Sequence, residues 1–247
     1  MIRNPILITL VTLAFIAAWL APTPSTAQQQ PGSPGAEAPS VPEYKPPARG
    51  VPGGRVGGAS RGTVKLTVPL PNIELLAPNG LAGLTTSPTP TLYFYVSRPV
   101  AWPTRFTISA PLRPDPVIEV NIPSPPQAGI YAVRTADYHV QLQPNVLYTW
   151  SVSVILNPQA PSRDIVASAS LLRTAAVAGL DYGLFRAPAN QRAALLAQAG
   201  LWYDAVAAAA EMEGFDRHAA LDALMDEAGL VEPVRYDRQA AGVIPVR

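Results

Sequence analysis

Residues 63–175 alternate between apolar and polar side chains with a period of two, the pattern of β-strands that bury one face. Proline-containing dipeptides interrupt the alternation, as expected of turns between short strands. The predicted strands are Thr63–Val68, Thr91–Ser97, Arg105–Ala110, Val117–Ile122, Ile130–Thr135, Val146–Leu156 and Asp164–Arg173. Short strands separated by proline turns favour an antiparallel β-sandwich over residues 63–175.

The pattern changes after Ala175, where the chain becomes rich in alanine and apolar residues recur at helical spacing. This predicts helices over residues 188–199, 201–213 and 217–228. Asp216 is placed to cap the third helix and Gly229 to end it. The expected fold is therefore α+β, with a helical hairpin over residues 186–230 after the sandwich. The remaining residues, 231–247, are expected to form a flexible tail.

The chain begins with the features of a secretory signal over residues 1–27. Arg3 precedes an apolar run from Ile6 to about Leu20, and small residues lead up to a cut after Ala27. An uncleaved anchor is the alternative, but the run is short for a membrane span, which needs about 20 residues. We expect a periplasmic or secreted protein with no stable membrane insertion after cleavage.

Residues 28–62 form a proline- and glycine-rich linker that ends in a basic collar, in which Arg49, Arg55 and Arg61 recur every six residues. A phosphate-binding P-loop would need a lysine after the second of its glycines, and the collar has none. We expect a tether with no bound nucleotide.

The stretch Leu142-Gln143-Pro144-Asn145-Val146-Leu147-Tyr148 resembles the immunoglobulin-like and fibronectin type III pattern that builds a tyrosine corner. The resemblance implies that the Tyr148 hydroxyl bonds to the backbone just upstream. Trp150, two residues further on, points to the same face of the strand and is expected in the core.

The segment around Gly200 resembles the turn between the two helices of a tetratricopeptide repeat. The resemblance implies that Gly200 makes the turn, that Trp202 packs across it and that the small side chain of Ala205 allows close helix packing. Trp202 and Tyr203 are adjacent, so they point about 100° apart on a helix. Either both pack against the sandwich, or one is a surface anchor for a partner.

The amino-acid composition limits the kinds of binding or catalytic site that the chain can form. The net charge is +1 and charged residues make up only 14% of the chain, so no strong field attracts nucleic acid. There is no cysteine, which excludes disulfides and thiolate metal sites. His139 and His218 are isolated, and Asp115 with Glu119 is best interpreted as a pair of solvated acids. No nucleophile motif is present. We therefore expect no cofactor, no metal and no enzymatic activity.

Charge is unevenly distributed along the chain. Residues 191–229 carry two arginines against seven carboxylates, a net charge of −5, whereas residues 45–61 hold four basic residues and no acid. This favours docking of the basic collar on the acidic helices, either within one chain or between copies. Exposed ion pairs are weak, so such docking would be salt-sensitive.

Taken together, the segments resemble the bacterial family Domain of Unknown Function 928. The matching pieces are Arg49–Gly62, Ser87–Tyr95, Tyr148-Thr149-Trp150 and Arg192–Ala205. The resemblance implies a location in the cell envelope and a secreted sandwich with helices, but no assigned activity.

The function expected from these features is that of a non-catalytic interaction or structural module in the envelope. Its partner would be an envelope protein contacted through Trp202, Tyr203 or the collar arginines, with weak self-association as a further expectation. A carbohydrate-binding module using Trp102, Tyr131 or Tyr138 is an alternative. A hydrolase is a weaker one, and would require Asp115, Asp137, His139 and a serine to converge.

Overall fold

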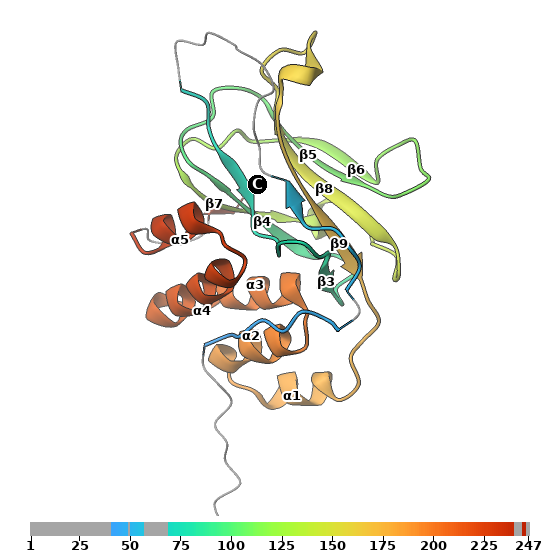
Figure 1. Ribbon diagram of the computed structural model, residues 1–247, viewed down its shortest axis with the longest axis vertical. Coiled ribbons are helices and arrows are strands. Elements are labelled where there is room, and N and C mark those ends of the chain that lie inside the picture. Colours follow the sequence, from blue (N-terminus) through green and yellow to red (C-terminus); the bar gives the residue numbers. More distant parts are fainter. Residues whose placement is uncertain (1–40, 49, 57–68, 240–243, 246–247) are drawn as a thin grey trace, which may run out of the picture. The chain divides into compact units, whose positions relative to one another are not determined.

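The computed structural model describes residues 41–48, 50–56, 69–239 and 244–245. The predicted signal, the predicted strand Thr63–Val68, and Arg49 and Arg61 of the basic collar lie outside these residues. The described part contains two sheets and five α-helices, so the fold is mixed α+β (Figure 1). None of its helices has the length and apolar character needed to cross a membrane.

The first sheet is predominantly antiparallel, with the strand order β1-β9-β8-β5-β6. Its strands are β1 (Arg55–Val56), β5 (Thr104–Ser109), β6 (Ile118–Ile122), β8 (Leu147–Val154) and β9 (Ile165–Arg173). The short strand β3 (Gly83–Thr85) pairs in parallel with β9. Alternate residues of β5 and β8, such as Phe106 and Trp150, are buried, because the period of two places them on one face.

The second sheet has the order β10-β7-β4-β2. Its strands are β2 (Ile73–Leu75), β4 (Thr91–Val96), β7 (Gly129–Arg134) and β10 (Ile244–Pro245). The buried side chains of both sheets belong to one hydrophobic core, which also includes residues of the helices.

Strand β4 is buried on both faces. Leu92 and Phe94 point to one face and Tyr93 and Tyr95 to the other, yet all four are at most 6% exposed. Helix α3 packs against β4, and the ring of Tyr95 lies 5.5 Å from that of Tyr236 in α5. The period of two predicted that this strand buries only one face. That prediction is wrong because helices from the end of the chain cover the second face.

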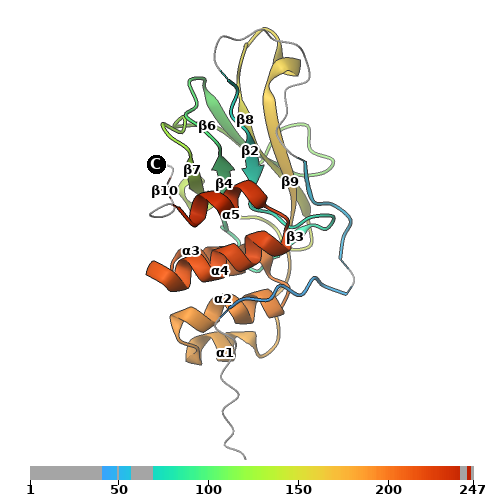
Figure 2. The same cartoon turned by 60° about the vertical axis from the view of Figure 1, so that its left-hand side comes forward.

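The helices follow the sheets in the chain. They are α1 (Leu180–Arg186), α2 (Ala189–Gln198), α3 (Trp202–Ala210), α4 (Gly214–Glu227) and α5 (Val231–Asp237). Two short 3-10 helices occupy Thr135–Tyr138 and Pro161–Arg163. Helices α2, α3 and α4 lie side by side in both views (Figures 1 and 2). The three predicted helices are confirmed, although α4 begins at Gly214, so Asp216 is not its cap. Gly229 follows α4 with φ = 67°, as the predicted helix end requires.

The segment expected to be a flexible tail is partly ordered. Residues 231–237 form α5, in which Pro233 lies in the first turn, where a proline is tolerated. Val234 and Asp237 of this helix are buried. Further along, Ile244 and Pro245 pair with β7. The prediction of a loose tail is therefore wrong for these residues, and the sequence pattern also missed α1, β2 and β3.

Candidate functional site

Tyr148 makes the bond that the tyrosine-corner resemblance implies. The backbone N–H of Gln143 donates to the Tyr148 hydroxyl at 2.8 Å, and Tyr148 is 3% exposed. Asn145, in the turn between them, has φ = 60°, a conformation that Asn tolerates well. Trp150 is fully buried, as expected. Both side chains therefore contribute to the core rather than to a binding surface.

Trp202 and Tyr203 are both buried, which excludes them as surface anchors. The Trp202 indole donates to the carbonyl of Leu76 at 2.9 Å. The Tyr203 hydroxyl accepts from the Trp150 indole at 2.8 Å. Burial raises the pKa of Tyr203, and the bond from Trp150 opposes that shift. The alternative in which both aromatic side chains pack against the sheets is the one that the structure supports.

The turn before these residues is made by Gly200. Gly200 has φ = 77°, and a Cβ there would lie 3.0 Å from the carbonyl oxygen of Lys45. Ala205 is fully buried in α3, where it faces the rest of the core. Gly200 therefore allows both the turn and the close approach of the segment around Lys45.

Residues 41–48 cross the helices and residues 50–56 run along the first sheet; we call both segments together the strap. The Lys45 N–H donates to the carbonyl of Ala197 in α2 at 3.0 Å. The Tyr44 N–H donates to a Glu227 carboxylate oxygen of α4 at 2.7 Å. The Tyr44 ring packs edge-on against Trp202, with centroids 4.8 Å apart, and burial raises the pKa of Tyr44 to about 12. The prediction of a flexible linker is wrong for the strap.

Arg55 is the collar residue that the structure describes. Its guanidinium donates to the carbonyls of Ala228 at 2.8 Å and Gly229 at 3.3 Å, just beyond α4, and to Ala77 at 3.3 Å. Burial lowers the pKa of Arg55, and the nearby Glu74 carboxylate opposes this. Arg55 thus docks on the helical layer within one chain. Arg55 binds backbone carbonyls at a helix end, where a cation is favourable, rather than the predicted carboxylates.

The candidate hydrolytic residues do not form a site. His139 and Asp115 are exposed, and Asp137 pairs with Arg134 at 3.5 Å. Glu119 pairs with Arg105 across the strand at 3.1 Å. Within the described ranges, no three His, Asp or Glu side chains are arranged to hold a metal ion.

His218 takes part in a cluster between α4 and α5. Asp237, fully buried, accepts from the guanidinium of Arg217 at 2.9 Å and lies 2.7 Å from Nδ1 of His218. The second Arg217 nitrogen lies 3.0 Å from the His218 ring nitrogens. Because each charged group has a partner, the cluster fixes α5 against α4 and is a structural feature.

Asp222 differs from a solvated acid. Its side chain is 15% exposed, one carboxylate oxygen accepts from Arg238 at 2.8 Å, and the other is buried without a hydrogen bond. Burial raises the pKa of Asp222, and Arg238 opposes the shift. By contrast, Asp226, one helical turn further along α4, has a side chain that is 58% exposed.

The helical layer contains two hollows, each lined in part by α2. One, of about 420 Å³, lies between α1, α2 and α3. Its lining residues are Asp181, Leu184, Phe185, Arg192, Leu196 and Ala208. The other, also of about 420 Å³, lies where α2 begins, α3 ends and α4 begins, and is lined by Ala189, Asn190, Glu211, Met212, Glu213 and Asp216.

Both hollows lie on the same face of α2. Ala189, Arg192 and Leu196 are three and seven residues apart, a spacing that places them on one helix face. On α3, Ala208 shares a face with Glu211 and Met212 in the same way. We therefore treat the two hollows as one feature, the α2–α3 groove.

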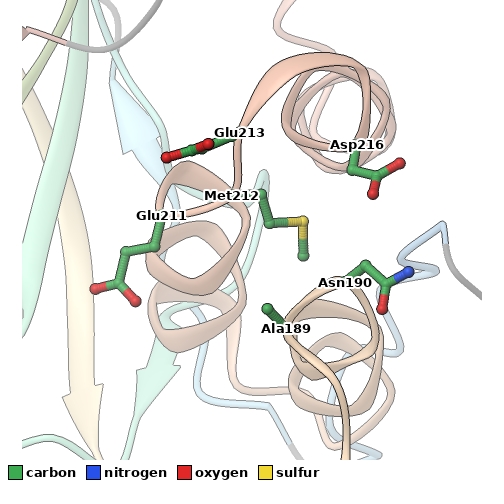
Figure 3. A pocket seen from close by; sticks show the side chains of 6 residues that line it. All are labelled: Ala189, Asn190, Glu211, Met212, Glu213 and Asp216. Atoms are coloured by element: carbon green, nitrogen blue, oxygen red, sulfur yellow. The ribbon is translucent and has the colours of Figure 1, made fainter.

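The acidic end of the groove is divided by Met212 (Figure 3). Its thioether lies between the helices. The carboxylates of Glu211 and Glu213 lie to one side of it, and Asp216 and Asn190 lie to the other. The carboxylates do not converge on one point, as a metal site would require. Such an arrangement suits a flexible basic side chain that can reach either group.

Exposed aromatic side chains lie on α1 and α4, the helices beside the groove, and one of them, Phe185, lines it. Phe185 is 86% exposed and Tyr182 is 65% exposed on α1, and Phe215 at the start of α4 is 83% exposed. Sequence reasoning missed all three, although Phe215 stands between Gly214 and the polar Asp216, which is an unusual setting for a core residue.

The family model described as Domain of Unknown Function (DUF928) matches residues 56–233. The chain belongs to this family. No curated protein and no solved structure shows a significant match to it. The matched range includes both sheets' central strands and the helices of the groove, so the groove is part of the DUF928 unit.

Proposed function

We propose that this DUF928 protein is a non-catalytic interaction module of the cell envelope, and that it binds a segment of an envelope protein in the α2–α3 groove. The exposure of Phe185, which lines the groove, and of Phe215, next in sequence to the lining residue Asp216, is the observation that carries this proposal. Large aromatic side chains at the surface are the typical anchors of protein interfaces. Exported location rests on the signal features of residues 1–27.

The chemistry of the groove suggests what the bound segment contains. Leu184, Phe185 and Leu196 offer an apolar surface at one end, and Glu211 and Asp216 offer acceptors at the other. A segment that carries one apolar and one basic side chain would bury its apolar group and pair its charge. The described residues that line the groove include no nucleophile motif, metal cluster or cofactor loop. Binding a protein segment requires no catalytic group.

The finer fold assignments belong to the same proposal. The Gln143–Tyr148 bond supports an immunoglobulin-like sandwich. The positive φ of Gly200 and the buried Ala205 support a tetratricopeptide-like hairpin of α2 and α3. Hairpins of this type bind extended peptides on an exposed helix face, which is consistent with a groove there.

Carbohydrate binding gains no support from the three aromatic residues that the sequence suggested for it. Tyr131 is 3% exposed and stacks on Phe94 with centroids 5.6 Å apart. Trp102 and Tyr138 are half-buried. An aromatic platform for a sugar ring needs an exposed face, so we retain the protein-interaction proposal.

Site-specific photo-crosslinking in the cell tests the proposal. A photoreactive residue is placed at position 185 or 215, and at Val166, which is 41% exposed on the first sheet, as a control. We expect one protein attached at 185 and 215 and not at 166. Attachment at 185 should also disappear in the Phe215→Asp variant. Equal labelling at all three positions, or no attachment at 185 and 215, would overturn the proposal.

A further inference from the structure

Strand β6 ends the first sheet, and no described strand pairs with its outer side (Figure 1). Its outward N–H and C=O groups are bonded to no other part of the described chain. A free edge of this kind is a template for pairing with another strand. Natural edges are usually protected by charged side chains, proline or a bulge. Ile118–Ile122 contains no lysine or proline, and its one charged side chain, Glu119, already pairs with Arg105 within the chain.

The sequence of β6, Ile-Glu-Val-Asn-Ile, is nearly the same in both directions. Antiparallel pairing of two copies centred on Val120 would place Val120 opposite its own counterpart. Each Ile118 would face an Ile122, and each Glu119 carboxylate would face an Asn121 amide that can donate to it. An interface about a two-fold axis requires this kind of self-complementarity.

We propose that two copies of this chain associate edge to edge through β6, with Val120 on the two-fold axis. The first sheets of the two copies then form one continuous sheet. Val120 is only half-buried in the single chain, between the buried Ile118 and Ile122, and the pairing would cover it. This inference is independent of the groove, so it stands or falls separately from the proposed function.

The loop before β6 supplies a second observation. Leu112 is 104% exposed and has φ = 61°, a left-handed conformation that strains a leucine and is usually taken by Gly or Asn. Neither the strain nor the exposure is explained within the chain. The two-fold axis would bring the Ile118 end of one copy to the Ile122 end of the other. The loop that carries Leu112 would therefore lie beside the second copy.

The interface is limited in extent. Pro116 and Pro123 flank β6 and cannot donate to a ladder, so pairing is confined to about five residues on each copy. Such a contact lies below the size of stable interfaces. The dimer is therefore weak, and its population depends on protein concentration.

A single introduced cysteine tests the geometry, because the chain has none of its own. In Val120→Cys, the two thiols would face each other across the axis with Cα atoms about 4.5–5.5 Å apart, within disulfide range. Under mild oxidation we expect a disulfide-linked dimer for V120C. The exposed Ser162→Cys is the control and should stay largely monomeric. Equal dimerisation of both variants, or none for V120C, would overturn the proposal.

Charge substitutions at Asn121 provide a second test that does not depend on disulfide chemistry. Within the chain Asn121 pairs with Arg105, whereas in the dimer it would face Glu119 of the second copy. N121E should therefore stabilise the monomer slightly and raise the dimer dissociation constant about fivefold. N121K should do the reverse. Sedimentation equilibrium measures the association and thermal unfolding measures the monomer. Equal dissociation constants for N121E and N121K would contradict the register.

Discussion

The indole N–H of Trp150 donates a 2.8 Å hydrogen bond to the hydroxyl of Tyr203, two side chains that lie 53 residues apart in the sequence. The same hydroxyl donates to the carbonyl of Ser170 at 2.9 Å. One oxygen thus joins β8, β9 and α3. Because all of these groups are largely removed from water, the helical layer depends on a polar contact inside the core of the sheets.

Removing the Tyr203 hydroxyl oxygen should destabilise the protein. Tyr203→Phe leaves the Trp150 N–H and the Ser170 carbonyl without a partner, which we expect to lower the free energy of unfolding by about 1–3 kcal/mol. Urea denaturation measures the loss. Tyr182→Phe is the matched control, because Tyr182 is 65% exposed, and its effect should stay within about 0.5 kcal/mol. Equal effects of the two substitutions would show that the Tyr203 bonds contribute nothing.

Gly83 allows Tyr203 to occupy its position. A Cβ at residue 83 would lie 2.5 Å from Cε2 of the Tyr203 ring. Gly83→Ala should therefore displace the ring and destabilise the protein by roughly 1–3 kcal/mol, the cost of overpacking.

Gly183, in the middle of α1, is the matched control for this substitution. A Cβ there would meet nothing within 4 Å. Gly183→Ala should leave the stability unchanged or raise it by up to about 1 kcal/mol, because alanine favours a helix. Thermal unfolding of both variants compares them. A Gly83→Ala protein as stable as the Gly183→Ala protein would contradict the close contact between Gly83 and Tyr203.

Arg55 should stabilise the protein through hydrogen-bond geometry rather than through charge alone. Arg55→Ala removes the donors to the carbonyls that follow α4 and should cost about 1.5–3 kcal/mol. Arg55→Lys keeps the charge but cannot reach several carbonyls at once, so it should recover only part of the loss.

Salt and a surface arginine provide the controls for Arg55. Since its partners are carbonyls, the loss should change little between low and high salt, unlike the docking of a collar on carboxylates. Arg235→Ala removes an exposed pair with Glu232 and should cost less than about 0.5 kcal/mol. Full recovery by lysine together with a strong salt dependence would favour the purely electrostatic alternative.

The raised pKa of Asp222 gives stability a pH dependence. The folded protein holds the Asp222 proton more tightly than the unfolded chain does, because burial disfavours the carboxylate. Stability therefore falls as pH rises from the ordinary aspartate pKa of about 3.9 through the raised value. Asp222→Asn should reduce this slope in urea denaturation at pH values from about 4 upward. An unaltered slope in Asp222→Asn would refute this assignment.

Much of the fold was predictable from local pattern. Strands β4 to β9 and helices α2 to α4 could be predicted from the spacing of their apolar residues and from the turn residues between them. These properties depend only on neighbours within one element. The Tyr148 corner was predictable for the same reason, since its bond to Gln143 spans only five residues. Of the candidate site, the sequence indicated the acidic charge of the helices, but the aromatic side chains that it suggested as anchors, Trp202 and Tyr203, are buried.

The features that could not be predicted from the sequence depend on contacts between distant segments. Whether Trp202 and Tyr203 are surface anchors or core residues was decided by Leu76 and Trp150, which meet them only after folding. The same holds for the strap, whose proline and glycine content predicts a free linker but whose backbone finds partners on α2 and α4. A period of two reports that one face of β4 is apolar. It cannot report that helices more than 100 residues later cover the other face, because burial is a property of the assembled layers and not of the strand.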